Sequence, residues 1–153
     1  LFVCLGNICR SPMAEAVFRR QVAEAGLTNQ FQIDSAGTGN WHIGKPPHEG
    51  TRRILTEKDI SYDGMTARQV GIQDFDEFDY IIAMDASNVS NLNRLLSGAD
   101  PSASMHLLLD FGPKRDTKDV PDPYYTGNFD EVYEMVDESC RHLLAWIREK
   151  EKL

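Results

Sequence analysis

Short apolar runs alternate along this chain with longer amphipathic segments. A continuous apolar run of about four to eight residues is typical of a buried parallel strand. The clearest one, Tyr80-Ile81-Ile82-Ala83-Met84, lies within 78–84. Residues 1–5 and 105–109 have the same apolar character, and residues 31–35 alternate between apolar and polar side chains. The pattern therefore predicts four strands, at 1–5, 31–35, 78–84 and 105–109.

The longer segments between these strands have helical periodicity. Residues 128–149 place apolar side chains on one face, and Gly26 is a suitable stop for a helix at 12–25. Ser11 suits the N-cap of that helix and Pro12 its first position. Further helices are predicted at 46–58 and 85–96, and a Gly-rich loop carrying Trp41 at 36–45.

The alternation of strands and helices predicts an α/β fold. We expect a four-stranded parallel sheet flanked by helices on both faces, a flavodoxin-like or Rossmann-like three-layer sandwich. The 153 residues fit one domain, 1–153, whose first strand reads as the end of a strand that begins upstream. Ligands of such sheets bind beyond the carboxyl ends of the strands, where residues 4–11 leave the first strand.

Composition and charge narrow the function classes. The chain is 41% hydrophobic and 26% charged, and none of its apolar runs approaches the roughly 18 residues of a membrane span. A net charge of -8 disfavours nucleic acid as a partner. Three cysteines without metal-type spacing, and no visible signal peptide, predict a cytoplasmic protein without a disulfide framework.

Residues 4–11 read Cys-Leu-Gly-Asn-Ile-Cys-Arg-Ser, and this spacing lets backbone N–H groups converge on an anion at a helix N-terminus. In such a nest Cys4 would be a thiolate nucleophile and Arg10 would bind two phosphate oxygens. The Ser11 hydroxyl could hydrogen-bond the sulfur. A buried, inert cysteine is the alternative for Cys4, and Cys9 either packs or forms a disulfide with Cys4 on oxidation. The residues expected to contact the phosphate or its ester are Leu5, Gly6, Asn7, Ile8 and Cys9.

Cleavage of a phosphate ester also needs a proton donor for the leaving oxygen. Asp122 is the candidate, because it lies in Val120-Pro121-Asp122-Pro123-Tyr124-Tyr125, where prolines stiffen the backbone beside two tyrosines. A simple turn is the alternative, since Asp-Pro pairs commonly mark turns. The acidic residues of 74–79 are expected to form a solvated connection rather than a metal site. The four histidines have no ligand spacing and are expected to be structural or surface residues: His42, His48, His106 and His142.

With these residues in place, the chain resembles the low-molecular-weight protein tyrosine phosphatase family over nearly its whole length. The resemblance is carried by Val-Cys-Leu-Gly-Asn-Ile-Cys-Arg-Ser-Pro at 3–12, and by segments 34–37, 67–69, 84–88 and 122–124. It implies that Cys4 is the nucleophile, Arg10 the transition-state clamp and Asp122 the general acid, with no metal or other cofactor. It further implies loop support from Asn7, Ser11, Ser35 and Asp85, and an entrance lined by Trp41 and Tyr124.

The resemblance also sets the expected substrates, phosphotyrosine-containing proteins, with inorganic phosphate as product. Many family members carry a histidine where this chain has Met65, so we expect altered loop rigidity or pH behaviour. Related phosphoarginine phosphatases place threonine at the position of Ile8, whereas isoleucine suits a phenyl ring. Related arsenate reductases carry a further cysteine pair, and here only Cys140 lies downstream. A phosphopeptide-binding module without turnover is the remaining alternative.

Overall fold

A parallel sheet of four strands forms the centre of the protein, whose computed structural model describes residues 1–153. The strand order is β2-β1-β3-β4, and all neighbouring pairs are parallel. This arrangement confirms the predicted α/β class and its flavodoxin-like layout. The strands are β1 (Phe2–Cys4), β2 (Ser35–Gly37), β3 (Tyr80–Ala83) and β4 (Ser104–Leu107).

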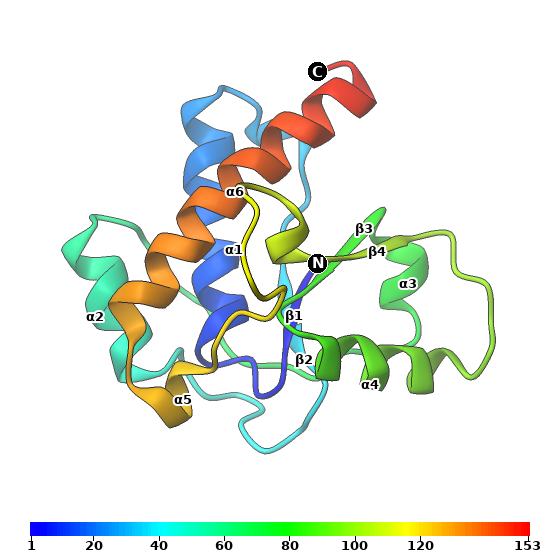
Figure 1. Ribbon diagram of the computed structural model, residues 1–153, viewed down its shortest axis with the longest axis horizontal. Helices are drawn as coiled ribbons and strands as arrows, with labels where there is room; N and C mark the ends of the chain where they lie inside the picture. The colour runs from blue at the N-terminus through cyan, green and yellow to red at the C-terminus, as the bar shows by residue number, and fades with distance from the viewer.

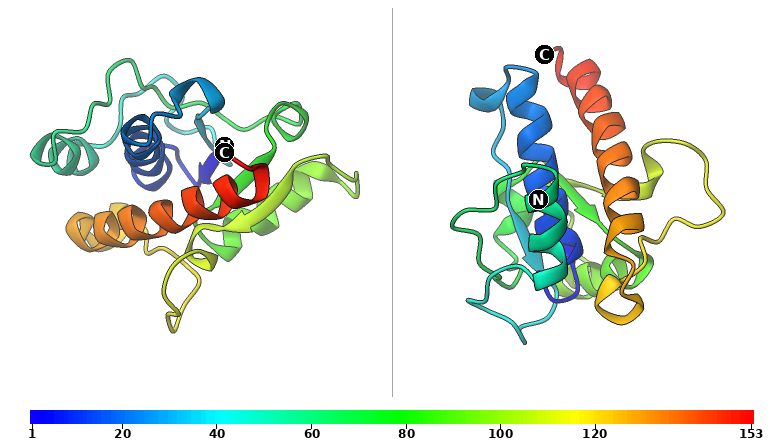
Figure 2. Two further views of the ribbon diagram at one scale, coloured as in Figure 1. Left: turned by 90° about the horizontal axis from the view of Figure 1, so that it is seen from above. Right: turned by 90° about the vertical axis from the view of Figure 1, so that its left-hand side faces the viewer.

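Helices cover both faces of this sheet (Figure 1). On one face α1 and α6 lie side by side, as both views of Figure 2 show, and on the other face α4 contacts β3 and β4. The helices are α1 (Arg10–Glu24), α2 (Glu49–Glu57), α3 (Asp74–Glu77), α4 (Ala86–Leu96), α5 (Pro123–Thr126) and α6 (Phe129–Glu151), with short 3-10 turns η1 (Thr28–Gln30) and η2 (Leu108–Asp110).

Alternating side chains of the strands feed two hydrophobic clusters, one on each face of the sheet. Phe2 and Ile82 point into the larger cluster, where α1, α2 and α6 pack. Val3 and Ile81 point into the smaller cluster, which α4 closes with Leu92. Because β1 and β3 are buried on both faces, their sequences are continuously apolar, and this explains why both were predictable.

The second and fourth strands differ from their predicted bounds. β2 was expected at 31–35, but its ladder with β1 begins at Ser35 and ends at Gly37. The alternating residues before Ser35 lead into the sheet without a paired ladder, although Asp34 O accepts a hydrogen bond from Phe2 N at 3.0 Å. The strand expected at 105–109 ends at Leu107, where the carboxylate of Asp110 accepts from Leu107 N and closes a 3-10 turn.

Two helices begin away from their predicted start. α1 begins at Arg10 with Cys9 as its cap residue, so the prediction of Ser11 as N-cap is wrong. α2 begins at Glu49 rather than at Pro46, because the ring nitrogen Nδ1 of His48 caps it by accepting from Gly50 N at 3.0 Å. A structural role was expected for His48, and this cap provides one.

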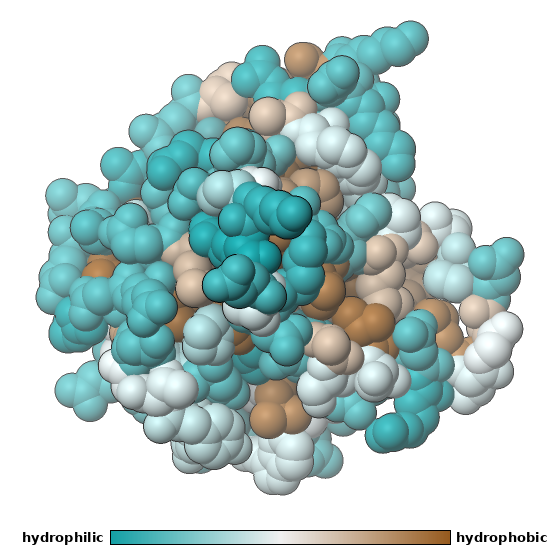
Figure 3. Space-filling view, viewed as in Figure 1, coloured by the Kyte–Doolittle hydropathy of each residue, from teal (hydrophilic) through white to brown (hydrophobic).

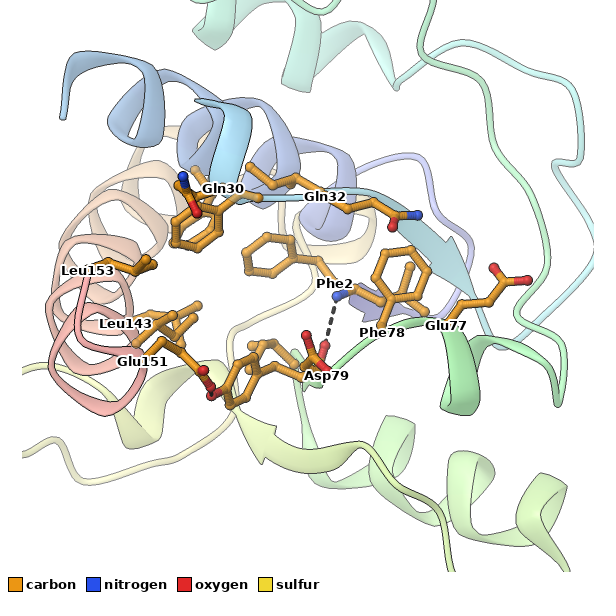
Figure 4. A pocket seen from close by; sticks show the side chains of 16 residues that line it. Phe2, Gln30, Gln32, Glu77, Phe78, Asp79, Leu143, Glu151 and Leu153 are labelled. Carbon is orange, nitrogen blue, oxygen red and sulfur yellow. Dashed lines mark hydrogen bonds between the residues drawn. The ribbon is translucent and has the colours of Figure 1, made fainter. Parts of the chain in front are cut away.

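No helix of the protein has both the length and the apolar character that a membrane span requires. An apolar hollow of about 300 Å³ lies at the amino ends of the strands, away from residues 4–11 (Figure 4). Phe2, Phe78 and Leu143 are among its walls, which include no cysteine, histidine, lysine or arginine. The hollow therefore offers no thiol, imidazole or basic side chain for phosphate chemistry.

Candidate active site

Residues 4–11 connect the carboxyl end of β1 to the start of α1 and curl around the sulfur of Cys4. Asn7 adopts a left-handed conformation with φ of 56°, and its backbone N–H donates to Cys4 Sγ at 3.3 Å. Gly37 backs this curl, since a Cβ there would lie 2.8 Å from the carbonyl oxygen of Leu5. The fold thus turns the backbone N–H of Asn7 toward the thiol of Cys4, in the sense that the spacing of the loop predicted.

The side chain of Asn7 fixes the loop to two other segments. Its Nδ2 donates to Ser11 Oγ at 2.8 Å and to Ser35 Oγ at 3.0 Å, and its Oδ1 accepts from the backbone N of Arg68 at 3.0 Å. Ser11 Oγ also lies 3.0 Å from Cys4 Sγ. Because Ser11 accepts from Asn7, its own proton can point at the sulfur at 3.0 Å or at the carbonyl oxygen of Ala36 at 3.5 Å. Asn7, Ser11 and Ser35 therefore form the connected network expected from the resemblance.

The network continues to Glu15, a residue that sequence reasoning missed. Ser35 Oγ donates to Glu15 Oε1 at 2.7 Å, and Arg19 lies 2.7 Å from the other carboxylate oxygen. The Glu15 side chain is 6% exposed and the Arg19 side chain 53% exposed, so the chain of contacts runs from the buried loop to solvent. The sequence signal for this contact was the spacing of four residues between Glu15 and Arg19, which lets the two side chains pair on one face of a helix.

Exchange of Glu15 for glutamine is expected to change how stability depends on pH. Burial raises the pKa of Glu15 from its ordinary value of 4.5, while the hydrogen bond from Ser35 and the charge of Arg19 oppose the rise. Since the folded pKa lies above the unfolded one, folding favours the neutral carboxyl. That contribution is complete below the unfolded pKa and is lost as pH rises through the folded pKa.

Urea unfolding of both proteins from about pH 4 to about pH 7 measures this effect. The unfolding free energy of the wild type should fall relative to that of Glu15→Gln as the pH rises. Parallel curves over the whole range would show that Glu15 does not titrate with a raised pKa. Ser61→Ala, an exposed neutral position, serves as a control that should follow the wild type.

Arg10 is held beneath the loop by groups from two other segments. Its side chain is 2% exposed, with Nη1 2.6 Å from Asp85 Oδ2 and 3.0 Å from the carbonyl oxygen of Val120. Burial alone would lower the pKa of Arg10, but the neighbouring charges of Cys4, Asp85 and Asp122 outweigh it and raise the pKa. Arg10 Nε is buried and has no hydrogen-bond partner in the protein, so one donor remains for an anion.

Asp122 is positioned by the turn that begins α5. Its Oδ1 accepts from Tyr124 N at 3.1 Å, and its Oδ2 lies 3.4 Å from Arg10 Nη2. A backbone hydrogen bond from Val120 N to Met84 O, 2.9 Å long, ties this segment to the end of β3. Asp122 therefore serves as a helix cap, as the turn interpretation implied, and also lies in the same hollow as Cys4.

This hollow has a volume of about 380 Å³. Trp41 is 64% exposed and Tyr124 52% exposed at its walls, and Ile8 supplies a buried apolar surface. Burial raises the pKa of the Cys9 thiol to about 12, so Cys9 stays protonated at neutral pH. The residues that line the hollow are Cys4, Leu5, Gly6, Ile8, Cys9, Trp41, His42, Asp122, Tyr124 and Tyr125.

Two of these lining residues were not among the predicted site residues. His42 was expected to be structural or on the surface, yet its ring lies in the wall of the hollow with its centroid 6.2 Å from that of Tyr124. Tyr125 stacks edge-on against Tyr124 at 5.2 Å. No local signal distinguishes His42 from the other histidines, because its place depends on the path of the 38–45 loop.

In the acidic segment 74–79, Asp76, Glu77 and Asp79 are exposed as predicted, but Asp74 is not. Asp74 is 2% exposed instead of solvated, and both of its carboxylate oxygens lie 3.0 Å from the guanidinium of Arg68. Burial alone would lower the pKa of Arg68, but hydrogen bonding and charge from Asp74 and Asp34 raise it. Because the backbone N–H of Arg68 donates to Asn7, this partly buried ion pair fixes a segment that supports the loop.

Comparison with known proteins gives consistent matches over the full chain. A family model described as low molecular weight phosphotyrosine protein phosphatase matches residues 1–153. The low molecular weight protein-tyrosine-phosphatase YfkJ of Bacillus subtilis is 56% identical over 153 residues, covering 100% of this chain and 97% of that protein.

Solved structures agree with this result. The crystal structure of YfkJ matches with a TM-score of 0.94 at 55% identity, covering 99% of this chain and 94% of that one. The structure of DARP, a Drosophila arginine phosphatase, matches with a TM-score of 0.89 at 32% identity, covering 96% of both chains.

Proposed function

The chain belongs to the low molecular weight phosphotyrosine protein phosphatase family, and from this premise we propose that it hydrolyses phosphotyrosine in proteins and releases inorganic phosphate. One observation carries the proposal. The sulfur of Cys4 lies in the hollow that Asp122 also lines, with Asn7 N–H at 3.3 Å and Ser11 Oγ at 3.0 Å. This arrangement supports the roles of Cys4 as nucleophile and Asp122 as acid around one ester-sized space.

The phosphate group would bind in the curl of residues 4–11. Backbone N–H groups and the N-terminal end of α1 supply partial positive charge there, and Arg10 supplies a full one. Asp85 holds one edge of the guanidinium, so the buried and unpartnered Nε would have a fixed orientation for an anion in the curl. We expect Arg10 to bind the equatorial oxygens most strongly in the transition state, where charge spreads over them.

The first chemical step transfers the phosphoryl group to sulfur. Cys4 Sγ attacks phosphorus as a thiolate, the bond to the tyrosine oxygen breaks, and Asp122 donates its proton to that oxygen. The products are free tyrosine hydroxyl, a cysteinyl phosphate and an Asp122 carboxylate. A protonated Asp122 is required at the start, and its position in the same hollow as Cys4 supports this role.

The second step returns the enzyme to its starting state. Asp122 accepts a proton from a water molecule, whose oxygen attacks phosphorus as the phosphorus–sulfur bond breaks. Ser11, whose Oγ lies 3.0 Å from Cys4 Sγ, would donate a hydrogen bond to the departing thiolate. Inorganic phosphate leaves, and Asp122 is protonated for the next cycle. The proposed chemistry uses no metal and no organic cofactor.

The walls of the hollow favour an aryl ester. Trp41 and Tyr124 offer aromatic surfaces beside the entrance, and Ile8 is apolar where a phosphoarginine phosphatase would gain from a hydroxyl. A phosphoserine side chain is too short to reach Cys4 past these walls. We propose the cytoplasm as the location, since all three cysteines are free thiols, and residues 1–153 as one catalytic domain.

Turnover of matched phosphotyrosine, phosphoarginine and phosphoserine peptides tests this proposal. The kcat/KM for phosphotyrosine should exceed the other two by at least about 10²-fold, because the ester must fill the aromatic hollow. Ile8→Thr should reduce the ratio of kcat/KM for the phosphotyrosine peptide to kcat/KM for the phosphoarginine peptide. A preference of the wild type for phosphoarginine would favour the alternative activity, and phosphate binding without any turnover would favour a binding module.

A further inference from the structure

A second hollow adjoins the proposed active site on the far side of Trp41. Its volume is about 370 Å³, and it shares Leu5 and Trp41 with the catalytic hollow. Figure 1 shows the helix α4 and the 38–45 loop at the same end of the molecule as residues 4–11. The second hollow is lined by Leu5, Thr38, Gly39, Trp41, Gln69, Val70, Asn91, Arg94 and Leu95.

Charge distinguishes this hollow from its surroundings. Arg94 is the only lysine or arginine that lines either hollow. Its guanidinium makes no ion pair, and its one side-chain hydrogen bond goes from Nη1 to Asn91 Oδ1 at 3.1 Å. Asn91 lies one helical turn before Arg94 on α4, so the bond directs an exposed guanidinium along the hollow.

The opposite rim of the catalytic hollow is acidic and aromatic. Asp122, Tyr124 and Tyr125 form it, and no cationic side chain lines it. The protein as a whole carries a net charge of -8, which repels acidic ligands from most of its surface. Figure 3 shows a largely hydrophilic face with small apolar areas near α4. The second hollow is therefore the place beside the active site where apolar surface and an unpaired positive charge coincide.

We propose that this second hollow, together with Arg94, binds the stretch of the substrate protein next to the phosphotyrosine and favours an acidic residue there. The inference rests on the proposed function. A polypeptide whose phosphotyrosine fills the catalytic hollow must continue over its rim, and at about 3.3 Å per extended residue it passes Trp41 within a few residues. Trp41 and Leu95 would contact its apolar groups, and Arg94 would pair with its carboxylate.

Four peptides test the inference, each with one phosphotyrosine. Two carry glutamate or glutamine two residues before the phosphotyrosine, and two carry glutamate or glutamine two residues after it. For the wild type, kcat/KM should be about three- to fivefold higher with glutamate on one of the two flanks, the size expected for an exposed ion pair. Arg94→Glu should remove or reverse this preference, and Arg94→Lys should keep most of it.

Arg148→Glu is the matched control, because Arg148 is an exposed arginine without an ion pair in the last turn of α6. Figure 1 shows that end of α6 at the opposite end of the molecule from the segment that joins β1 to α1. Arg148→Glu changes the net charge by the same amount as Arg94→Glu and should keep the wild-type preference. Equal loss of preference in both variants would overturn the inference in favour of a general field effect, as would a wild type indifferent to both flanks. Failure of the wild type to hydrolyse phosphotyrosine in any peptide, or phenyl phosphate, would overturn the proposed function instead.

Discussion

Replacement of Cys4 by serine is expected to lower kcat for phenyl phosphate by at least about 10⁴-fold, because a hydroxyl at neutral pH is a far weaker nucleophile than a thiolate. Serine keeps an acceptor for the backbone N–H of Asn7, so the loop should keep its shape. Calorimetric titration with inorganic phosphate should therefore still detect binding to Cys4→Ser. The same assays in EDTA should leave wild-type turnover unchanged, because the proposed chemistry uses no metal.

Cys140→Ala is the control for loss of a thiol as such. Cys140 is fully buried in the larger hydrophobic cluster, away from the hollow, and burial raises its pKa. This variant should keep turnover per folded molecule even if its stability falls. Substantial turnover by Cys4→Ser, or equal losses in the two variants, would contradict the role proposed for Cys4.

Replacement of Asp122 by asparagine is expected to lower kcat for phenyl phosphate by about 10²- to 10⁴-fold, the usual range for loss of a general acid. Asparagine can still accept the hydrogen bond from Tyr124 N, so the start of α5 should be preserved. The loss should shrink for aryl esters whose phenol is more acidic, since such a leaving group needs less protonation. A series of substituted phenyl phosphates measures this dependence.

Asp119→Asn provides the comparison within the same segment. Asp119 is exposed, and its Oδ1 accepts from Ala86 N at 2.9 Å without lining the hollow. We expect it to retain most of the wild-type kcat. If Asp122→Asn lost the same factor for every leaving group, Asp122 would act through binding or loop position and not through proton transfer.

The central strands and the phosphate-binding loop could be predicted because their causes are local. The apolar run at 80–84 favours burial on both faces and so a central parallel strand, and the short spacing from Cys4 to Arg10 suits an anion nest. The bounds of the strands at the edges of the sheet were harder to predict. β2 pairs with β1 only from Ser35 onward, and this register depends on where β1 lies in space.

Some supporting residues of the site, Asp74, Glu15 and His42, escaped prediction because their partners are distant in sequence. Asp74 looked like part of a solvated acidic run, yet Arg68 pairs with it and makes its burial possible. Glu15 meets Ser35 only after α1 and β2 pack together, and His42 joins the catalytic hollow through the path of its loop. Residue types therefore indicated the reactive groups, and the family resemblance supplied part of the network that positions them, but neither pointed to these three residues.

Mass spectrometry of the enzyme quenched with acid during turnover of an aryl phosphate shows whether a cysteinyl phosphate forms. We expect one phosphoryl group on the peptide that contains Cys4, formed within one turnover, and none on that peptide in Cys4→Ser. Turnover without a phosphorylated Cys4, or a phosphoryl group trapped on another side chain, would contradict the role proposed for Cys4.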